Sequence, residues 1–397
     1  MTRAARAGEG VYRETPVLSS RTLSEKVGGT LVLKAENLQR TGSFKIRGAI
    51  AKITALGEGC SAGVVTGSAG NHAQAVAYAA RARGVPCEVF MPFGAPIAKF
   101  EAATSLGAVV RLFGETVDES LAAARARSEE AGLAFVHPFE DPDVIAGQGG
   151  VGLELLAQVP DLARVIVPIG GGGLASGIAI AVKSSKPAVE VIGVQVDACA
   201  PFARSLSEGR VVAVDSAMTI ADGIAVKRPG DLTLSLIQEW VDGVVGVGED
   251  DVAEAMVFLL ERTKLVVEGA GAVGVAALLT GRTAAAASGT TVVILSGGNV
   301  DAGMLAQVTR RHETQAGRRL VLPALVSDRP GSLARLLALV GELGANLLDV
   351  QHIREGIDLH VRETGVQLVL ETRSSEHAQE VREAVRAAGY TEPRTMR

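Results

Sequence analysis

The chain has 397 residues, of which 47% are hydrophobic and only 3% aromatic, so we expect two or three domains with cores of small aliphatic side chains. The net charge of −5 gives no general attraction for nucleic acid or anionic lipid, and three widely spaced cysteines provide neither a disulfide framework nor a CxxC metal site. The sequence has no apolar stretch of the ~18–20 residues that a membrane span needs and no apolar leader after its first residues, which predicts a cytoplasmic protein.

Short runs rich in β-branched residues alternate with alanine-rich helical stretches from residue 31 to about residue 300. This alternation predicts an α/β fold, in which helices cover both faces of a parallel sheet. Several of the predicted strands end in Gly or Ser directly before a helix, as in "TGSAGNH" and "IGGGGLASG". Open α/β sheets bind ligands at the carboxyl ends of their strands, so the functional residues are expected in these turns.

A polar stretch at residues 310–319 separates this region from a C-terminal segment with a different pattern. That segment predicts the order βαββα over about 75 residues, which is typical of a ferredoxin-like module. A last edge strand near the C-terminus is disfavoured by Pro393. We therefore predict domains at 1–318 and 319–397.

The first of three notable turns is the glycine run that follows the apolar strand "RVIVPI". Backbone N–H groups at such a turn, together with the helix dipole, can bind a phosphate, although a glycine run is as often only a tight connection. An alternative is a dinucleotide site, because Gly170, Gly172 and Ala175 fit G-x-G-x-x-G/A and Asp197 ends the next strand.

The second turn begins at Ser68, which we predict to be a helix N-cap, and Asn71 lies in the first helical turn. The N–H groups of residues 69–72 would then be available to an anion. The third turn, "SGGN", follows the strand "TTVVIL" and leaves the hydroxyl of Ser296 at a strand end.

Lys45 lies in a fourth segment, "TGSFKIRGA", between the apolar residues Phe44 and Ile46. Desolvation by such neighbours lowers the pKa of a lysine, and only the neutral amine is a nucleophile. Most lysines are simply solvated. A candidate nucleophilic lysine, a phosphate turn, a carboxylate turn and a strand-end hydroxyl together describe a pyridoxal phosphate site for an amino acid.

These segments, with "TIADGIAVKRPG" and "VVEGAGAVGVAAL", resemble the threonine ammonia-lyase (threonine dehydratase) family of fold type II over residues 10–310. The resemblance implies β-elimination from L-threonine to 2-oxobutanoate and ammonia, activity on L-serine, and a small subdomain at about 45–150. Residues 320–390 are similar to an ACT regulatory module through "LVSDRPGSLARLL" and "LGANLLDV". L-Serine ammonia-lyase or serine racemase activity is the nearest alternative, and a NAD-dependent enzyme is a distant one that leaves Lys45 unexplained.

The resemblance also implies roles for individual residues. Lys45 would hold the cofactor covalently and move protons at the substrate, while Glu268 would lie near the reacting face and Ser68 would act beside them. The implied cofactor-binding residues are Lys45, Phe44, Asn71, Gly170, Gly171, Gly172, Gly173, Leu174 and Ser296. The substrate carboxylate would bind to Ser68, Ala69, Gly70 and Asn71.

Two further expectations concern metal and regulation. Gln195 stands where serine racemases have a metal-binding glutamate, and Pro201 follows six residues later, so no divalent metal is predicted. In the ACT-like module, Gly331 and Asn346 would lie beside an amino-acid effector, with isoleucine as the leading hypothesis and valine as the alternative. Because such modules pair, we expect a homodimer or homotetramer.

Overall fold

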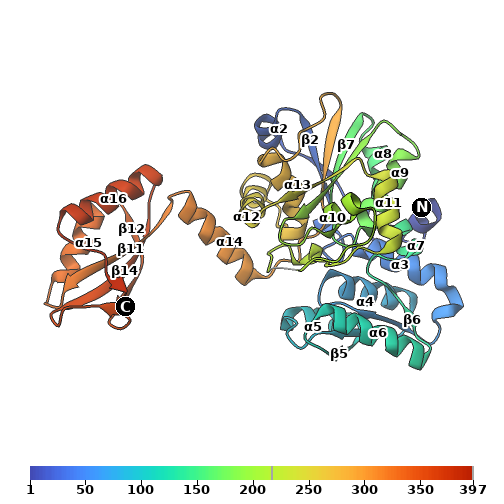
Figure 1. Ribbon diagram of the computed structural model, residues 1–397, viewed down its shortest axis with the longest axis horizontal. Helices are drawn as coiled ribbons and strands as arrows, with labels where there is room; N and C mark the ends of the chain where they lie inside the picture. The colour runs from blue at the N-terminus through green and yellow to red at the C-terminus, as the bar shows by residue number, and fades with distance from the viewer. Residues whose placement is uncertain (216–217, 396–397) are drawn as a thin grey trace. The chain divides into compact units, whose positions relative to one another are not determined.

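The computed structural model describes residues 1–215 and 218–395 (Figure 1). Their contacts divide the chain into two units, Met1–Val300 and Asp301–Arg397. This division lies earlier than the predicted boundary at residue 318, because helix α14 (Ala302–Gln315) belongs to the second unit. Among the described residues, no helix is both long and apolar enough to cross a membrane.

The larger part of the first unit is built on a six-stranded sheet with the order β1-β2-β10-β7-β8-β9. Neighbouring strands are parallel except β1, which pairs antiparallel with β2 at the edge. The strands are β1 (Val17–Ser19), β2 (Thr30–Ala35), β7 (Leu162–Pro168), β8 (Glu190–Val196), β9 (Gly243–Val247) and β10 (Thr290–Leu295). The predicted parallel α/β fold is confirmed.

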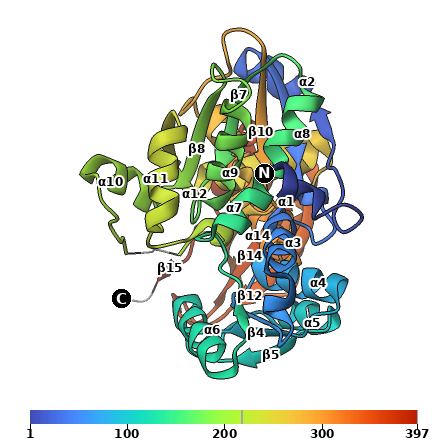
Figure 2. The ribbon, with the colours of Figure 1, turned by 90° about the vertical axis from the view of Figure 1, so that its right-hand side faces the viewer.

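Helices cover both faces of this sheet. Figure 2 shows α8 and α9 over strands β7, β8 and β10, and α9 also contacts α11. Helix α13 packs on the opposite face, where Gly274 lies against Ile166 and Val293, and α12 packs on α13. The helices of this part are α1 (Thr2–Arg6), α2 (Arg21–Val27), α8 (Gly150–Gln158), α9 (Gly173–Lys183), α10 (Pro201–Glu208), α11 (Asp231–Trp240), α12 (Glu249–Phe258) and α13 (Gly269–Leu279).

The smaller part of the first unit is a parallel sheet with the order β5-β4-β3-β6. Aliphatic side chains of α3 and α4 pack on one face of this sheet, and α6 covers the other. The elements are α3 (Lys45–Leu56), β3 (Val64–Gly67), α4 (Asn71–Arg83), β4 (Cys87–Met91), α5 (Ile97–Ser105), β5 (Val109–Leu112), α6 (Val117–Ala131), β6 (Ala134–Phe135) and α7 (Pro142–Gln148). The chain therefore passes from the large sheet into this part at Lys45 and returns through α7.

The second unit contains a three-stranded antiparallel sheet with the order β11-β14-β12. Its core is formed by alternate residues of β11 and β14 against the apolar faces of α15 and α16. The predicted order βαββα is observed, with a short additional pair, β13 and β15. The elements are β11 (Arg319–Ser327), α15 (Ser332–Glu342), β12 (Asn346–Ile353), β13 (Ile357–Asp358), β14 (Glu363–Glu371), α16 (Ser375–Ala387) and β15 (Arg394–Thr395).

Candidate active site

Lys45 is the first residue of α3, at the point where the two parts of the first unit meet. Its turn is joined to the end of β10, because Phe44 N–H donates to the Ser296 carbonyl at 3.1 Å and Ser43 forms a β-bridge with Gly297. The Lys45 ammonium donates to the carbonyl of Pro138 at 3.0 Å. The predicted lysine and strand-end serine are thus brought together by the fold.

The environment of Lys45 makes its ammonium easier to deprotonate than that of a solvated lysine. Desolvation lowers its pKa to about 8, although the nearby Glu268 carboxylate acts in the opposite direction. Burial also lowers the pKa of His72 to about 3 and that of His137 to about 4, so both imidazoles are neutral at pH 7. Lys45 therefore changes between ammonium and amine near pH 8, whereas both imidazoles stay neutral there.

The glycine turn between β7 and α9 has no space for side chains. Gly172 has φ of +91° and is the N-cap of α9. A Cβ atom on Gly171 would lie 2.1 Å from the ring of Phe139, and one on Gly170 would lie 2.9 Å from the Cα of Ile224. Since a glycine N-cap has no side chain with which to cap the helix, the N–H groups at the start of α9 can serve a bound phosphate.

Asn71, Glu268 and Asn299 form one hydrogen-bonded chain. The Asn71 Nδ2 donates to Glu268 Oε1 at 2.7 Å, and Asn299 Nδ2 donates to Asn71 Oδ1 at 2.7 Å and to the carbonyl of Thr41 at 2.8 Å. Burial, with a smaller effect of the Asp222 carboxylate, raises the pKa of Glu268 to about 7, although the hydrogen bond from Asn71 acts in the opposite direction. A carboxyl group with this pKa can hold or release a proton near neutral pH.

The prediction that Ser68 caps α4 is wrong. Ser68 still belongs to the sheet, because its N–H donates to the carbonyl of Phe90 at 2.9 Å, and α4 begins only at Asn71 with Gly70 as its N-cap. The Ser68 hydroxyl instead accepts from the Gly70 N–H at 3.2 Å. The start of α4 thus has no serine cap.

The other predicted site residues lie elsewhere. Gly331 is the N-cap of α15 with φ of +82°, and Asn346 begins β12 and donates to Glu371 at 3.1 Å, both in the second unit. Gln195 has a structural role, because its Oε1 accepts a hydrogen bond from the N–H of Phe202 at 3.0 Å. Within residues 1–215 and 218–395, no three His, Cys, Asp or Glu side chains gather as a metal-binding group.

Sequence reasoning assigned no role to the segment after β6, which lies beside Lys45, the glycine turn and the start of α11. Besides Pro138 and Phe139, it contains Glu140, whose carboxylate accepts from the N–H of Leu232 at 2.6 Å and of Thr233 at 3.2 Å. The proline and acidic residues of "HPFED" mark a turn, but nothing local indicates what that turn contacts. Asn299 was also missed, although it ends the "SGGN" segment.

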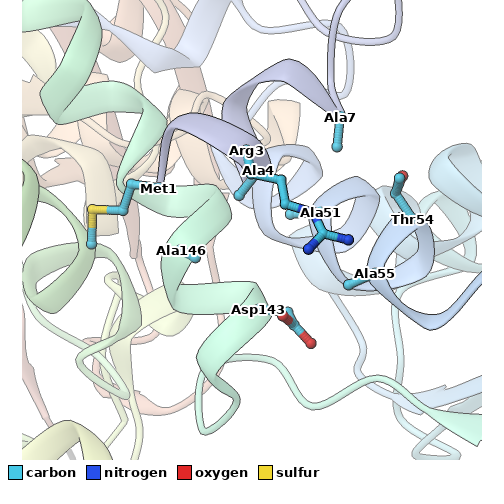
Figure 3. Close-up of a pocket in the computed structure, with 9 residues that line it drawn as sticks. All are labelled: Met1, Arg3, Ala4, Ala7, Ala51, Thr54, Ala55, Asp143 and Ala146. Atoms are coloured by element: carbon cyan, nitrogen blue, oxygen red, sulfur yellow. The ribbon is translucent and has the colours of Figure 1, made fainter.

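An opening of about 420 Å³ on the outer side of α3 is lined by residues of α1, α3 and α7 (Figure 3). Alanines make up most of its wall, together with Met1, Arg3, Thr54 and Asp143. None of the predicted site residues lines it. The site chemistry therefore lies in the turns at the strand ends and not in this opening.

Comparison with known proteins agrees with this arrangement. A family model described as "Pyridoxal-phosphate dependent enzyme" matches residues 9–297. An L-threonine ammonia-lyase of Thermotoga maritima is 46% identical over 393 residues, which is 98% of this chain and 96% of the relative. The solved structure of a threonine deaminase from T.th. is 43% identical with a TM-score of 0.71 and covers 76% of this chain and 97% of its own. Maize serine racemase is 38% identical with a TM-score of 0.74, covering 79% and 97%.

Proposed function

The chain belongs to the pyridoxal-phosphate dependent enzyme family, and we propose on this basis that it converts L-threonine to 2-oxobutanoate and ammonia. The observation that supports this most directly is that the turn of Lys45 is hydrogen-bonded to the strand-end turn of Ser296 and, through Asn299, to Asn71 at the start of α4. The relative from Thermotoga maritima, which spans nearly the whole chain, is named for the same reaction.

The residues present fit the cofactor. Gly170 to Leu174 would bind its phosphate through backbone N–H groups. The turn must consist of glycines, because Cβ atoms at Gly171 and Gly172 would collide with the side chains of Phe139 and Phe202. Lys45 would hold it covalently, Phe44 would pack beside the ring, and Asn71 would hydrogen-bond the ring hydroxyl. When bound, pyridoxal phosphate supplies a sink for the electrons left on Cα when the substrate loses its proton.

The chain's own groups account for the proton movements. The Lys45 amine would take the Cα proton, and the ammonium so formed would return a proton to the β-hydroxyl as it leaves as water. The unsaturated amine that results is hydrolysed to the keto acid and ammonia, so the sequence involves no net oxidation. The N–H groups of Ala69 to Asn71 would bind the substrate carboxylate, and the Ser68 hydroxyl, which accepts from the Gly70 N–H, would lie beside them.

Ser296 would face the ring nitrogen of the cofactor. A hydroxyl there, unlike a carboxylate, does not hold a proton on that nitrogen, so the ring is a weaker electron sink. Rapid β-elimination therefore suits this site better than transamination. L-Serine would react in the same way to give pyruvate, because the missing methyl group is worth only about 1–3 kcal/mol in a pocket. Racemisation of serine is a second candidate activity, because the fold is similar to that of maize serine racemase.

The test combines spectroscopy, labelling and product analysis. The purified protein should have a visible absorbance band that borohydride removes, and mass spectrometry should find the reduced cofactor on Lys45. Lys52 is the internal control for labelling. It lies on the same helix but pairs with Asp141 at 2.7 Å, so it should carry no reduced cofactor. Threonine should yield 2-oxobutanoate with the native protein and not with Lys45→Ala. A native protein that binds no pyridoxal phosphate would refute the proposal.

The second unit would regulate this activity as an ACT-like module. The relative from Thermotoga maritima aligns with 98% of the chain and so shares this unit. Gly331 leaves the start of α15 open, and Asn346 begins β12 beyond the other end of that helix. An amino-acid effector such as isoleucine or valine would therefore bind where two modules pair, beside Gly331 of one copy and Asn346 of the other. The proposal includes a dimer or tetramer and a cytoplasmic location.

Isoleucine should change the activity of the full chain, and this response should be lost in Gly331→Ala and in a chain ending near residue 318. An unchanged rate at saturating isoleucine and valine in the full chain would refute a regulatory role, and light scattering would establish the oligomeric state.

A further inference from the structure

Asn299 connects three turns that are far apart in the sequence. Its Nδ2 donates at 2.8 Å to the carbonyl of Thr41, in the turn that carries Lys45, and at 2.7 Å to Asn71, at the start of α4. Asn299 itself follows β10, and it lies three residues after Ser296. Asn299 therefore lies where the large and small parts of the first unit meet, between the turn of Lys45 and the start of α4.

The chemistry of these partners fixes which way each amide points. A backbone carbonyl can only accept, so the atom of Asn299 that faces Thr41 must be the amino group. The same amino group faces Asn71, whose nearest atom must therefore be its oxygen. The amino group of Asn71 is consequently directed at Glu268, to which it donates at 2.7 Å.

The backbone around these side chains leaves little room for another arrangement. A Cβ on Gly42, which has φ of +71°, would lie 2.1 Å from Asn299 Oδ1. A Cβ on Gly297 would lie 2.3 Å from Glu268 Oε1 and 3.2 Å from Asn71 Nδ2. Two glycines thus allow the amides and the carboxyl group to sit directly against the main chain.

We propose that Asn299 is a positioning residue that holds the Asn71 amide as a hydrogen-bond donor toward the site, so that a ligand oxygen beside Asn71 is bound as an acceptor. An amide nitrogen has two hydrogens, and Glu268 takes one of them. The other remains for the ring oxygen of the cofactor, which would be bound in its deprotonated form. This inference rests on the proposed function, since it takes that oxygen to belong to pyridoxal phosphate.

The decisive variant is Asn299→Asp, which has nearly the same shape but only acceptor atoms. Its carboxylate would face the oxygens of Thr41 and Asn71, and Asn71 would turn its amino group away from the site to satisfy it. Loss of one donor to an anionic oxygen should weaken pyridoxal phosphate binding about 10-fold or more. Equilibrium dialysis against the cofactor measures this directly, without any need for turnover.

A double-mutant cycle shows whether Asn299 acts through Asn71. In an Asn71→Ala background, Asn299→Asp should change cofactor affinity by less than about 2-fold, because the amide that it orients is already absent. Asn37→Asp is the matched control, since Asn37 is a buried asparagine that donates to a backbone carbonyl, that of Val266 at 3.1 Å. It should retain native cofactor affinity.

Equal losses from Asn299→Asp in both backgrounds would overturn this inference and leave the proposed function intact. A native protein that fails to bind pyridoxal phosphate would overturn both. If Asn299→Asp does not fold, Asn299→Ala measured in the same two backgrounds makes the same comparison, because it also removes the donor that orients Asn71.

Discussion

Replacement of Arg47 by methionine should strongly destabilise the first unit. Arg47 lies two residues after Lys45 on α3, and its side chain is completely buried. It donates to both oxygens of Glu36 at 2.8 Å and to those of Glu154 at 2.5 and 2.9 Å. Lys34, also fully buried, donates to Glu154 at 2.5 Å, so the cluster contains two cations and two carboxylates.

Arg47→Met would keep most of the apolar stem but leave two carboxylates with one cation. Burial by itself raises the pKa of Glu36, whereas Arg47 and its hydrogen bonds lower it below the usual value, so the ionised form depends on the arginine. Breaking a buried ion pair from one side costs about 3–5 kcal/mol, a large share of the ~5–15 kcal/mol that stabilises a typical protein. Adding Glu36→Gln should restore part of this loss, because it removes the unpaired charge.

Urea denaturation followed by tryptophan fluorescence measures the effect. Trp240 is the only tryptophan in the chain and lies in α11 of the first unit, so its signal reports that unit. Arg21→Met is the control, because Arg21 is 89% exposed and 3.7 Å from Glu25, and it should change the free energy of unfolding by less than about 1 kcal/mol. A loss below about 1 kcal/mol in Arg47→Met, or additive losses in the double variant, would refute this reasoning.

Two further predictions concern the site itself. Gly171→Ala should reduce the affinity for pyridoxal phosphate at least about 10-fold in equilibrium dialysis, because its Cβ would lie 2.1 Å from the ring of Phe139. Gly59→Ala is the control and should bind the cofactor normally, because a Cβ there would meet no atom within 4 Å. The rate at which the cofactor-free protein takes up pyridoxal phosphate should rise with pH up to about 8 and then level off, because only the neutral amine of Lys45 reacts. Glu268→Gln should move this midpoint to lower pH, since the Glu268 carboxylate raises the pKa of Lys45; an unchanged midpoint in stopped-flow absorbance would contradict the assignment.

The parts of the fold that follow from local chemistry could be predicted from the sequence. Strands β3, β7 and β10 are short apolar runs, and a Gly or Ser follows each of them within two residues. The fold class, the cofactor and the reaction followed from these turns and their family resemblance. Ser68 was misjudged because a serine before a helix is a common cap, whereas here the chain bends at Ala69 and Gly70 and the helix begins only at Asn71.

Contacts between distant segments could not be predicted in this way. Asn71 and Asn299 are 228 positions apart, and neither "AGNH" nor "SGGN" indicates the other. The same holds for Arg47, whose partner Glu154 is 107 positions away. An arginine in the first turn of a helix is most often solvated, and only the fold reveals that this one is buried among carboxylates. Local pattern therefore locates the turns of the site, while the orientation of their side chains depends on partners that only the folded chain supplies.

The helices of this protein differ in whether a side chain caps their first turn. Helices α2, α6 and α16 are capped by the side chains of Ser20, Thr116 and Ser374. Helices α4 and α9, like α8, begin after glycines and have no side-chain cap. Relative to a capping serine or threonine, a glycine N-cap costs only about a few tenths of a kcal/mol, so leaving the starts of α4 and α9 open to an anionic ligand costs the protein little. A ligand that supplies those acceptors stabilises the folded state in proportion to its affinity. The uncapped helix starts thus tie the stability of this unit to occupation of its site.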